Sequence, residues 1–406
     1  ACYKPNAEAG NFRYISYSFG ESLLSWLQSH YPETYAEIIQ ADRDAAEANN
    51  GYGNALAGAF HHSILPLARR RDKRTQIRWG IAAFEHHFGH KPQGFWLPEM
   101  AVDKETLSVL ADEGIEYTLL AARQIVNLPF EGGSGPYEIK LSRGRRITVF
   151  VRDDQLSSEI SFNIHHLGGA GHWARNALTA ARKSAGPMLL LATAGETFGH
   201  HYAGEEQFLY WLVSHEALAI GYRVLPLNQY FAESEPFGTV EIHEPSSWSD
   251  QIGLANWATG LGSENTLWKG ALRRALDNVA SEVDRVYEDM AKQHEFDPWE
   301  VRNQYVPVLL GDVSAEDFIH EQVPSINKNA VEPLQNLLTA EELTQRMYTS
   351  YTFTNNDLDS PQPRYAIACA AAALGVAQQA TGQVLSERLM SDLSVVTASN
   401  TELNGA

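Results

Sequence analysis

The stretch Gly94-Phe95-Trp96-Leu97-Pro98-Glu99 is a short aromatic and apolar run that ends in a proline followed by a carboxylate. Residues 103–114 come next and have the pattern of an amphipathic helix, with Asp103 as its N-cap and Gly114 at its end. A second apolar run, residues 115–121, predicts a buried strand. Glu99 is therefore expected where a strand passes into a helix, and in parallel α/β folds this junction faces the ligand-binding side of the sheet.

The same alternation of strands and helices is predicted over much of the chain. Residues 1–10 are expected to be irregular, and residues 137–141 and 145–153 to pair as a hairpin. The other predicted strands are 12–20, 187–193, 223–231 and 239–242, and the helices are 21–30, 76–87, 172–185 and 204–219. After residue 260 the pattern is helical, over 268–294, 339–348 and 364–393. We expect an α/β part over residues 1–260 and a helical region over residues 261–406.

Composition narrows the class of protein. The chain has 406 residues, 44% of them hydrophobic, and a formal net charge of −19. This charge argues against a nucleic-acid partner, because phosphate binding needs clustered Lys and Arg. Two cysteines, Cys2 and Cys369, are too few for a disulfide framework. No apolar run reaches the roughly 18 residues of a membrane span. We therefore expect a cytoplasmic location. The sequence starts at Ala1 rather than Met, so the possibility that an upstream targeting segment was removed stays open. Nothing predicts the oligomeric state.

A second strand end resembles the first in its chemistry. The apolar run 187–193 leads into Ala194-Gly195-Glu196-Thr197-Phe198-Gly199-His200-His201. Two carboxylates that approach from facing strand ends suit glycoside cleavage, one at the anomeric carbon and one as proton donor. Nearby aromatic side chains such as Trp96 offer flat faces for sugar rings. The alternative is that each Glu is an ordinary capping or hydrogen-bonding residue.

The segments 94–103 (Gly-Phe-Trp-Leu-Pro-Glu-Met-Ala-Val-Asp) and 195–201 (Gly-Glu-Thr-Phe-Gly-His-His) together resemble glycoside hydrolase family 57, in particular a bacterial branch with a helical C-terminal region. Further similarities cover residues 53–54, 62–67, 75–80, 152–157, 244–249 and 346–350. The resemblance implies an incomplete (β/α)7 barrel followed by a mostly helical region. It also implies a retaining α-glycosidase that acts on α-glucan or a related oligosaccharide, by hydrolysis or transglycosylation, and it implies no cofactor.

By this resemblance Glu99 is the nucleophile, and the acid/base is an Asp two residues before the Glu of the later motif. That position holds Ala194. A methyl group transfers no proton, and loss of a general acid/base costs about 10²- to 10⁴-fold in rate. Three explanations stay open: an engineered substitution, natural loss that leaves a non-catalytic carbohydrate-binding protein, or replacement by Glu196. We favour the first, an acid/base-disabled variant, because the surrounding motif is intact. The family's first motif, a His near a Gln-Pro pair, has no counterpart here.

The resemblance also implies a set of substrate-binding residues. For the histidines the alternative is a satisfied core position, and for Asp153 it is a local ion pair with its neighbours. His86 and His90 have the i, i+4 spacing of metal ligands, but the sequence lacks His-Glu-x-x-His, so no metal is predicted. A metal-dependent polysaccharide deacetylase is a further alternative. The predicted substrate-binding residues are His62, Trp96, Asp153, Glu196, His200 and Trp248.

Overall fold

The structure is a computed structural model that describes residues 2–129, 133–184, 186–249, 254–385, 387–397 and Gly405. Its residues separate into two compact units. The first unit comprises Ala1–Gly58 and Phe84–Trp248, and the second comprises Ala59–Ala83 and Ser249–Ala406. The chain thus enters the second unit early, through residues 59–83, and again beyond residue 248.

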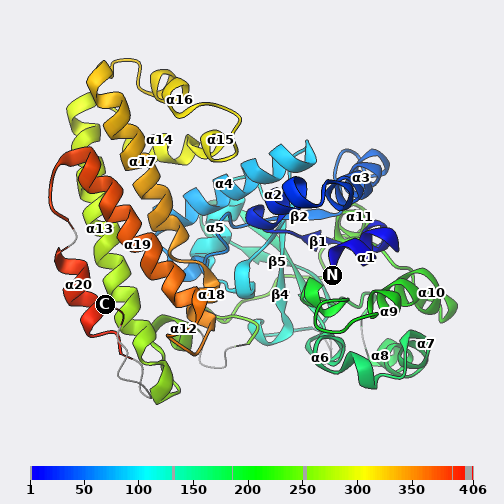
Figure 1. The fold of residues 1–406 in the computed structure, drawn as a ribbon. Helices are drawn as coiled ribbons and strands as arrows, with labels where there is room; N and C mark the ends of the chain where they lie inside the picture. The colour runs from blue at the N-terminus through cyan, green and yellow to red at the C-terminus, as the bar shows by residue number, and fades with distance from the viewer. Residues whose placement is uncertain are drawn as a thin grey trace. The chain divides into compact units, whose positions relative to one another are not determined.

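The first unit is built on one six-stranded sheet with the strand order β1-β2-β3-β4-β6-β5. Neighbouring strands are parallel except for β5, which pairs antiparallel to β6 and is joined to it through the turn Ser142–Gly144. The mixed α/β prediction and the hairpin prediction are therefore confirmed (Figure 1). The strands are β1 (Tyr17–Ser18), β2 (Ala55–Gly58), β3 (Gly94–Trp96), β4 (Tyr117–Ala121), β5 (Gly135–Lys140) and β6 (Arg146–Arg152).

Helix α5 (Lys104–Asp112) follows β3 as the sequence predicts. The Asp103 side chain accepts a hydrogen bond from the backbone N–H of Thr106 at 2.6 Å, which satisfies one of the unpaired donors of the first turn. The other helices of this unit are α1 (Tyr3–Glu8), α2 (Glu21–His30), α3 (Pro32–Ala48), α6 (Asp154–Asn163), α7 (Ala170–Trp173), α8 (Thr179–Ser184), α9 (Glu206–Trp211), α10 (Ala217–Ala219) and α11 (Leu227–Glu233). Helix α4 (Arg70–Phe88) has residues in both units.

Four predictions of local structure in the first unit are wrong, two near its N-terminus and two near residues 223–242. Residues 3–8 form helix α1 rather than an irregular segment, and the strand predicted over 12–20 shrinks to the two residues of β1. Residues 223–231, predicted as a strand, instead lead into α11, because Pro226 stands at its N-cap and Leu227 packs into the core. Residues 239–242 form isolated bridges only.

The apolar segment 187–193 is also not a strand, although it runs beside the end of β6. The backbone N–H of Asp153 donates to the carbonyl of Leu190 at 2.8 Å. The backbone N–H groups of Leu190 and Ala192 bind the side-chain hydroxyls of Ser134 and Ser157, both at 3.1 Å. Because hydroxyl groups rather than a neighbouring strand satisfy these amides, no regular ladder forms.

The core of the sheet contains a cluster centred on Tyr117 and Phe150, whose ring centroids lie 5.2 Å apart in an edge-to-face arrangement. Gly94 makes this packing possible, since a Cβ atom at that position would lie 2.2 Å from the Tyr117 ring. The partly buried Trp96, Leu190, Ala192 and Trp248 pack against the same cluster. The cluster therefore links the end of β3 to the segment that precedes Ala194.

The second unit is helical, as predicted. The long helix α13 (Trp268–His294) matches the helix predicted over 268–294 and buries an apolar stripe that includes Leu272, Leu276 and Val283. It packs with α17 (Val331–Arg346) and α19 (Pro361–Thr381), beside which it lies in Figure 1. The helix predicted over 364–393 is interrupted, because Gly382 ends α19 in the left-handed conformation before α20 (Glu387–Ser394) begins. The shorter helices are α12 (Ala255–Thr259), α14 (Pro298–Gln304), α15 (Val306–Leu309), α16 (Ala315–Gln322) and α18 (Ser350–Thr354).

In the part of the chain that the structure describes, no helix is both long enough and apolar enough to span a bilayer. Cys2 and Cys369 are both buried free thiols.

Candidate active site

Glu99 lies directly beyond the carboxyl end of β3, in a single 3-10 turn, Pro98–Met100. Its φ angle is 57° and that of Met100 is 47°, so two successive residues with side chains adopt the left-handed conformation. Each such residue costs roughly 1–3 kcal/mol unless its surroundings hold it, and residues of this kind cluster at functional sites. The backbone strain therefore marks the same residue that the sequence selects.

Hydrogen bonds from two other loops hold this turn in place. The Gln124 side chain is fully buried and donates to the Met100 carbonyl at 2.8 Å and to the Ser246 hydroxyl at 3.3 Å. Val102 and Ser246 form a backbone bridge with hydrogen bonds of 2.9 and 3.1 Å. This bridge places the segment that ends at Trp248 alongside the Glu99 turn.

Trp248 contacts the Glu99 carboxylate directly. Its indole Nε1–H donates to Glu99 Oε2 at 3.2 Å, and its backbone N–H lies 3.5 Å from the Glu99 carbonyl oxygen. A hydrogen bond to an ionised carboxylate is stronger than one between neutral groups. Trp248 is thus placed to fix the orientation of the carboxylate, a role that the sequence did not predict for it.

Arg152 connects Trp248 with the segment that leads to Ala194. Its guanidinium carbon lies 5.8 Å from the centroid of the Trp248 ring, and its Nη1 donates to the Ala192 carbonyl at 2.9 Å. Its Nε donates to Asp154 at 3.1 Å, so the local ion pair here is Arg152 with Asp154. Ala194 itself is exposed, in an extended conformation, immediately before the 3-10 turn Gly195–Thr197.

Helix α1 holds the loop that follows Ala194. The Tyr3 hydroxyl donates to Glu196 Oε1 at 2.7 Å, and the Asn6 side chain donates to the Phe198 carbonyl at 2.7 Å. Asn6 is 4% exposed, so this contact is sheltered from water. Sequence reasoning missed both residues, because residues 1–10 carried no signal beyond an expected irregular segment.

Asp153 has a structural role in this fold as a helix cap. It is the N-cap of α6, and its Oδ1 accepts from the backbone N–H of Leu156 at 2.8 Å. Burial raises the pKa of its carboxyl group, while the hydrogen bonds from the helix N-terminus oppose that rise. Its contact with a sugar stays a prediction.

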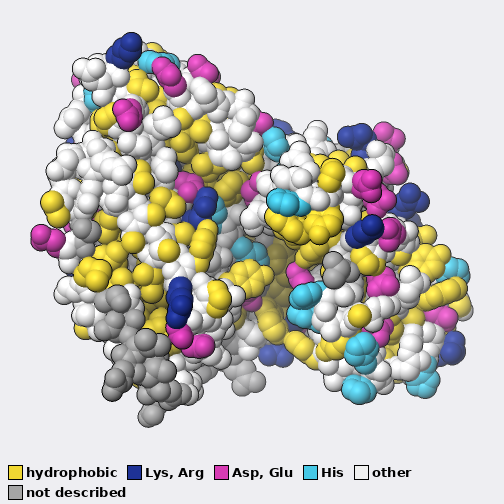
Figure 2. All heavy atoms as spheres, in the orientation of Figure 1, with side chains coloured by type: hydrophobic (Ala, Val, Ile, Leu, Met, Phe, Trp, Pro, Cys, Tyr) yellow, Lys and Arg dark blue, Asp and Glu magenta, His cyan; other side chains and the backbone are white. Residues whose placement is uncertain are grey.

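His200 is exposed, with its ring centroid 5.3 Å from that of His201. Figure 2 shows that histidine side chains gather on the surface of the part of the first unit that holds α6 to α9. The exposed histidines of this part are His165, His166, His172, His200, His201 and His215. The sugar contact expected of His200 stays a prediction.

His62 belongs to the second unit, where residues 349–351 hold it. Its Nδ1 lies 2.8 Å from the Ser350 hydroxyl, and the Ser350 backbone N–H donates to the His62 carbonyl at 2.9 Å. The imidazole stacks on the Tyr351 ring with centroids 5.6 Å apart and an interplanar angle of 17°. Tyr351 is 57% exposed, so this stacked pair presents an aromatic surface of a kind that the sequence alone did not reveal.

The described residues contain no group of three His, Cys, Asp or Glu side chains arranged to hold a metal ion. His90, considered above with His86, instead contacts the buried carboxylate of Asp42 through its Nε2 at 2.6 Å. This contact raises the pKa of His90 against the opposing effect of burial.

Fold and site together define an α/β protein with a strained, indole-bound carboxylate at the carboxyl end of β3, a strand that is parallel to both of its neighbours. The sequence profile described as glycosyl hydrolase family 57 matches residues 4–242, more than half of the chain. The chain belongs to this family, which confirms the resemblance seen in the sequence. A second profile, a domain of unknown function (DUF3536), matches residues 265–406, which contain α13 to α20.

Curated relatives and solved structures agree with this assignment. The chain is 27% identical over 204 residues to the 1,4-alpha-glucan branching enzyme of Thermococcus kodakarensis. This match covers 41% of this chain and 29% of that protein. It is 31% identical over 151 residues to alpha-amylase 1 of Dictyoglomus thermophilum, 36% of this chain and 21% of that protein. The matched segments thus span less than a third of these relatives. The exo-type maltose-forming amylase of Pyrococcus sp. ST04 has the same fold, with a TM-score of 0.79 at 17% identity over 96% of this chain and 73% of its own.

Proposed function

We propose that this chain carries the site of a retaining α-glycosidase that acts on α-glucan or a related oligosaccharide, by hydrolysis or transfer to another sugar. Glu99 is the nucleophile, and position 194 is the acid/base position, which alanine disables in this chain. The observation that carries the proposal is the hydrogen bond from Trp248 to Glu99 in its strained turn. The activities of the relatives, a 1,4-alpha-glucan branching enzyme and an alpha-amylase, support α-glucan as the substrate class.

In the proposed reaction the Glu99 carboxylate attacks the anomeric carbon of a glucosyl unit. A bond forms between that carbon and a Glu99 oxygen, and the bond to the leaving oxygen breaks. The Trp248 N–H keeps the carboxylate oriented for this attack. A sugar leaving group needs a proton as it departs, and Ala194 has none to give. Fluoride departs without a proton, so an α-glucosyl fluoride bypasses the missing acid.

Glu196 is a weak candidate to replace the acid/base. Its Oε1 accepts the hydroxyl of Tyr3, a contact that fixes the carboxylate against helix α1. This contact supports the interpretation that Glu196 shapes the loop, while position 194 is the one from which a proton is delivered. Whether alanine arose by engineering or by natural loss does not change the chemistry proposed here.

Chemical rescue with azide tests the proposal. With α-glucosyl fluoride, Glu99 displaces fluoride to form a glucosyl ester, and azide then attacks the same carbon and expels the Glu99 carboxylate, a step that needs no proton. We expect azide to accelerate turnover and the product to be α-glucosyl azide, because two displacements retain the configuration. Product configuration is measured by proton NMR.

The Glu99→Gln variant is the control for this experiment and is expected to form no glucosyl azide. A parent protein that gives no glucosyl azide, yet binds malto-oligosaccharides, would instead support the alternative of a non-catalytic carbohydrate-binding protein. A β-configured azide product would contradict the role of Glu99 as nucleophile.

Replacing Trp248 by Phe is expected to slow the release of fluoride from α-glucosyl fluoride by about 10- to 100-fold. The reason is that the variant keeps the aromatic ring but loses a hydrogen bond to a charged group, worth about 1.5–3 kcal/mol. The rate is measured as the first-turnover burst of fluoride. Trp211→Phe, at a surface position on α9 that is 46% exposed, is the matched control and should retain the parent rate. A Trp248→Phe burst within twofold of the parent would remove Trp248 from the mechanism.

A further inference from the structure

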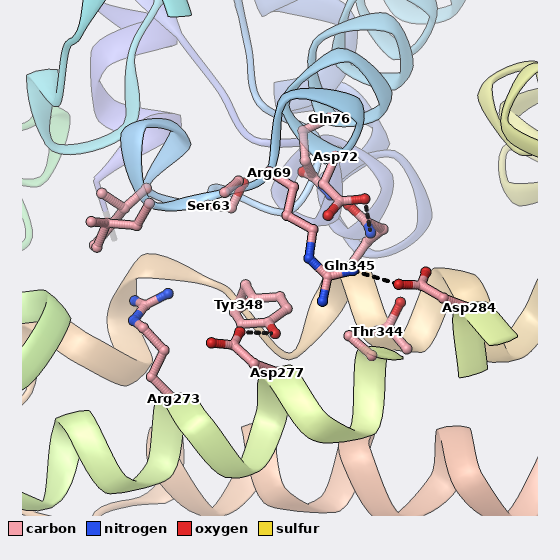
Figure 3. Close-up of a pocket in the computed structure, with 14 residues that line it drawn as sticks. Ser63, Arg69, Asp72, Gln76, Arg273, Asp277, Asp284, Thr344, Gln345 and Tyr348 are labelled. Atoms are coloured by element: carbon pink, nitrogen blue, oxygen red, sulfur yellow. Dashed lines mark hydrogen bonds and ion pairs between the residues drawn. The ribbon is translucent and has the colours of Figure 1, made fainter. Parts of the chain in front are cut away.

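The second unit contains a cavity of about 40 Å³ that the proposed reaction does not use. Its polar lining includes Ser63, Arg69, Arg273, Asp277 and Tyr348 (Figure 3). A volume of about 10–15 Å³ is enough for one water molecule, so the cavity has room for a ligand of only a few heavy atoms.

The Ser63 side chain is a buried polar group without a partner. The residue is 3% exposed, and its hydroxyl has no hydrogen-bond partner among the described residues. A backbone bridge to Thr349 fixes its position at the wall of the cavity. Because buried hydroxyl groups in proteins are nearly always hydrogen-bonded, this one is expected to bind something inside the cavity.

Arg273 reaches the same space from the opposite wall. In Figure 3 its side chain extends from α13 toward the loop that carries Ser63. Its guanidinium carbon lies 4.0 Å from the centroid of the Phe353 ring, and its Nε is buried without a hydrogen-bond partner among the described residues. Burial lowers the pKa of this guanidinium, and the negative charge of the nearby Asp277 only partly opposes that effect.

The other charged groups around the cavity already have partners. Arg69 pairs with Asp284, and the Asp72 carboxylate accepts from Arg302 at 2.7 Å. Asp277, one turn beyond Arg273 on α13, accepts the Tyr348 hydroxyl at 2.6 Å. Within the described lining, Arg273 is therefore the arginine that no carboxylate binds, while Asp277 keeps some negative charge close by.

We propose that this cavity binds a small monovalent anion, a halide or the carboxylate of a one- or two-carbon acid, between Arg273 and Ser63. Ser63 and Arg273 both line the cavity and each carries a buried unpartnered donor, and the volume excludes larger ligands. The nearby Asp277 charge disfavours anions with more than one negative charge. This site does not depend on the proposed glycosidase activity.

Thermal unfolding of the full chain at constant sodium concentration tests the site. Exchanging 0.1 M sodium gluconate, which is too large for the cavity, for chloride, bromide or formate is expected to raise the melting temperature by about 2–4 °C. Sulfate at matched ionic strength should give no such rise. The three monovalent anions separate a halide site from a carboxylate site, and bromide is also located directly by anomalous diffraction.

Arg273→Gln should abolish the anion-specific rise, whereas Arg285→Gln, at an exposed position on the same helix, should keep it. If Arg273→Gln does not fold, Ser63→Ala keeps the cation and should reduce the rise at least twofold. Equal melting temperatures in all salts, a rise that persists in both cavity variants, or a larger effect of sulfate would each overturn the proposal and leave the cavity to water.

Discussion

Replacing Ala194 by Asp is expected to raise the rate of malto-oligosaccharide turnover by about 10²- to 10⁴-fold, the usual contribution of a general acid/base. In the proposed mechanism the departing sugar oxygen takes a proton from position 194, where the parent chain offers only a methyl group. The gain should appear with sugar leaving groups and be much smaller with α-glucosyl fluoride, because fluoride departs without protonation. Product formation is measured by chromatography of labelled oligosaccharides under saturating substrate.

Ala194→Asn is the matched control, since it has nearly the shape of Asp but no acidic proton. It should stay as slow as the parent on malto-oligosaccharides. If Ala194→Asp and Ala194→Asn are equally inactive on every α-glucan offered, position 194 is not the acid/base position. If the parent already turns over oligosaccharides at the rate of Ala194→Asp, another residue supplies the proton, and Glu196 is the first to test.

Replacing Arg302 by Met is expected to lower the free energy of unfolding by about 3–5 kcal/mol. Arg302 is 1% exposed and donates to Glu341 at 2.8 Å and to Asp72 at 2.7 Å, and Glu341 is fully buried. The substitution keeps an apolar side chain in place but leaves the Glu341 carboxylate without its counter-charge. Urea unfolding, followed by circular dichroism, measures the loss.

The loss should depend on pH. Burial raises the pKa of Glu341 to about 7, and Arg302 opposes this effect. An acid with a higher pKa in the folded state holds its proton more tightly there, so stability falls as pH rises from the unfolded value, about 4.3, through the folded one. The free energy of unfolding of the Arg302→Met variant should therefore be lower at pH 8 than at pH 5.

Two further variants control for packing. The double variant Arg302→Met with Glu341→Leu removes both charges and should recover most of the lost stability. Arg285→Met, at an exposed position, should change it by no more than about 0.5 kcal/mol. A single variant as stable as the parent would mean that the buried ion pair contributes nothing to the second unit.

Secondary structure was predicted correctly from the sequence where a single local pattern, such as a cap or a hydrophobic periodicity, determines it. The Asp103 cap, the apolar run of β4 and the stripe on α13 each follow from periodicity and capping, and all are confirmed. The position of Glu99 at a strand end was read the same way. The left-handed conformation of Glu99 could not be predicted, because nothing in the sequence marks a residue other than glycine as having a positive φ angle. Tertiary contacts hold this turn, among them the hydrogen bond from the Gln124 side chain to the Met100 carbonyl.

Prediction failed where tertiary contacts decide. Residues 187–193 are apolar enough for a strand, but serine hydroxyls satisfy the amides of Leu190 and Ala192, so no ladder forms. The contacts of Trp248 with Glu99 and of Tyr3 with Glu196 join residues 149 and 193 positions apart. Such pairings depend on the path of the whole chain, which periodicity and spacing do not contain.

The most direct test of Glu99 as nucleophile is a peptide mass map of the parent protein quenched during its reaction with α-glucosyl fluoride. In the proposed mechanism Ala194 also slows the second step, so the ester should accumulate. One glucosyl unit is then expected on the peptide that contains Glu99 and on no peptide of Glu99→Gln. An unmodified Glu99 peptide in a protein that has released fluoride, or a glucosyl unit on another carboxylate, would contradict the account.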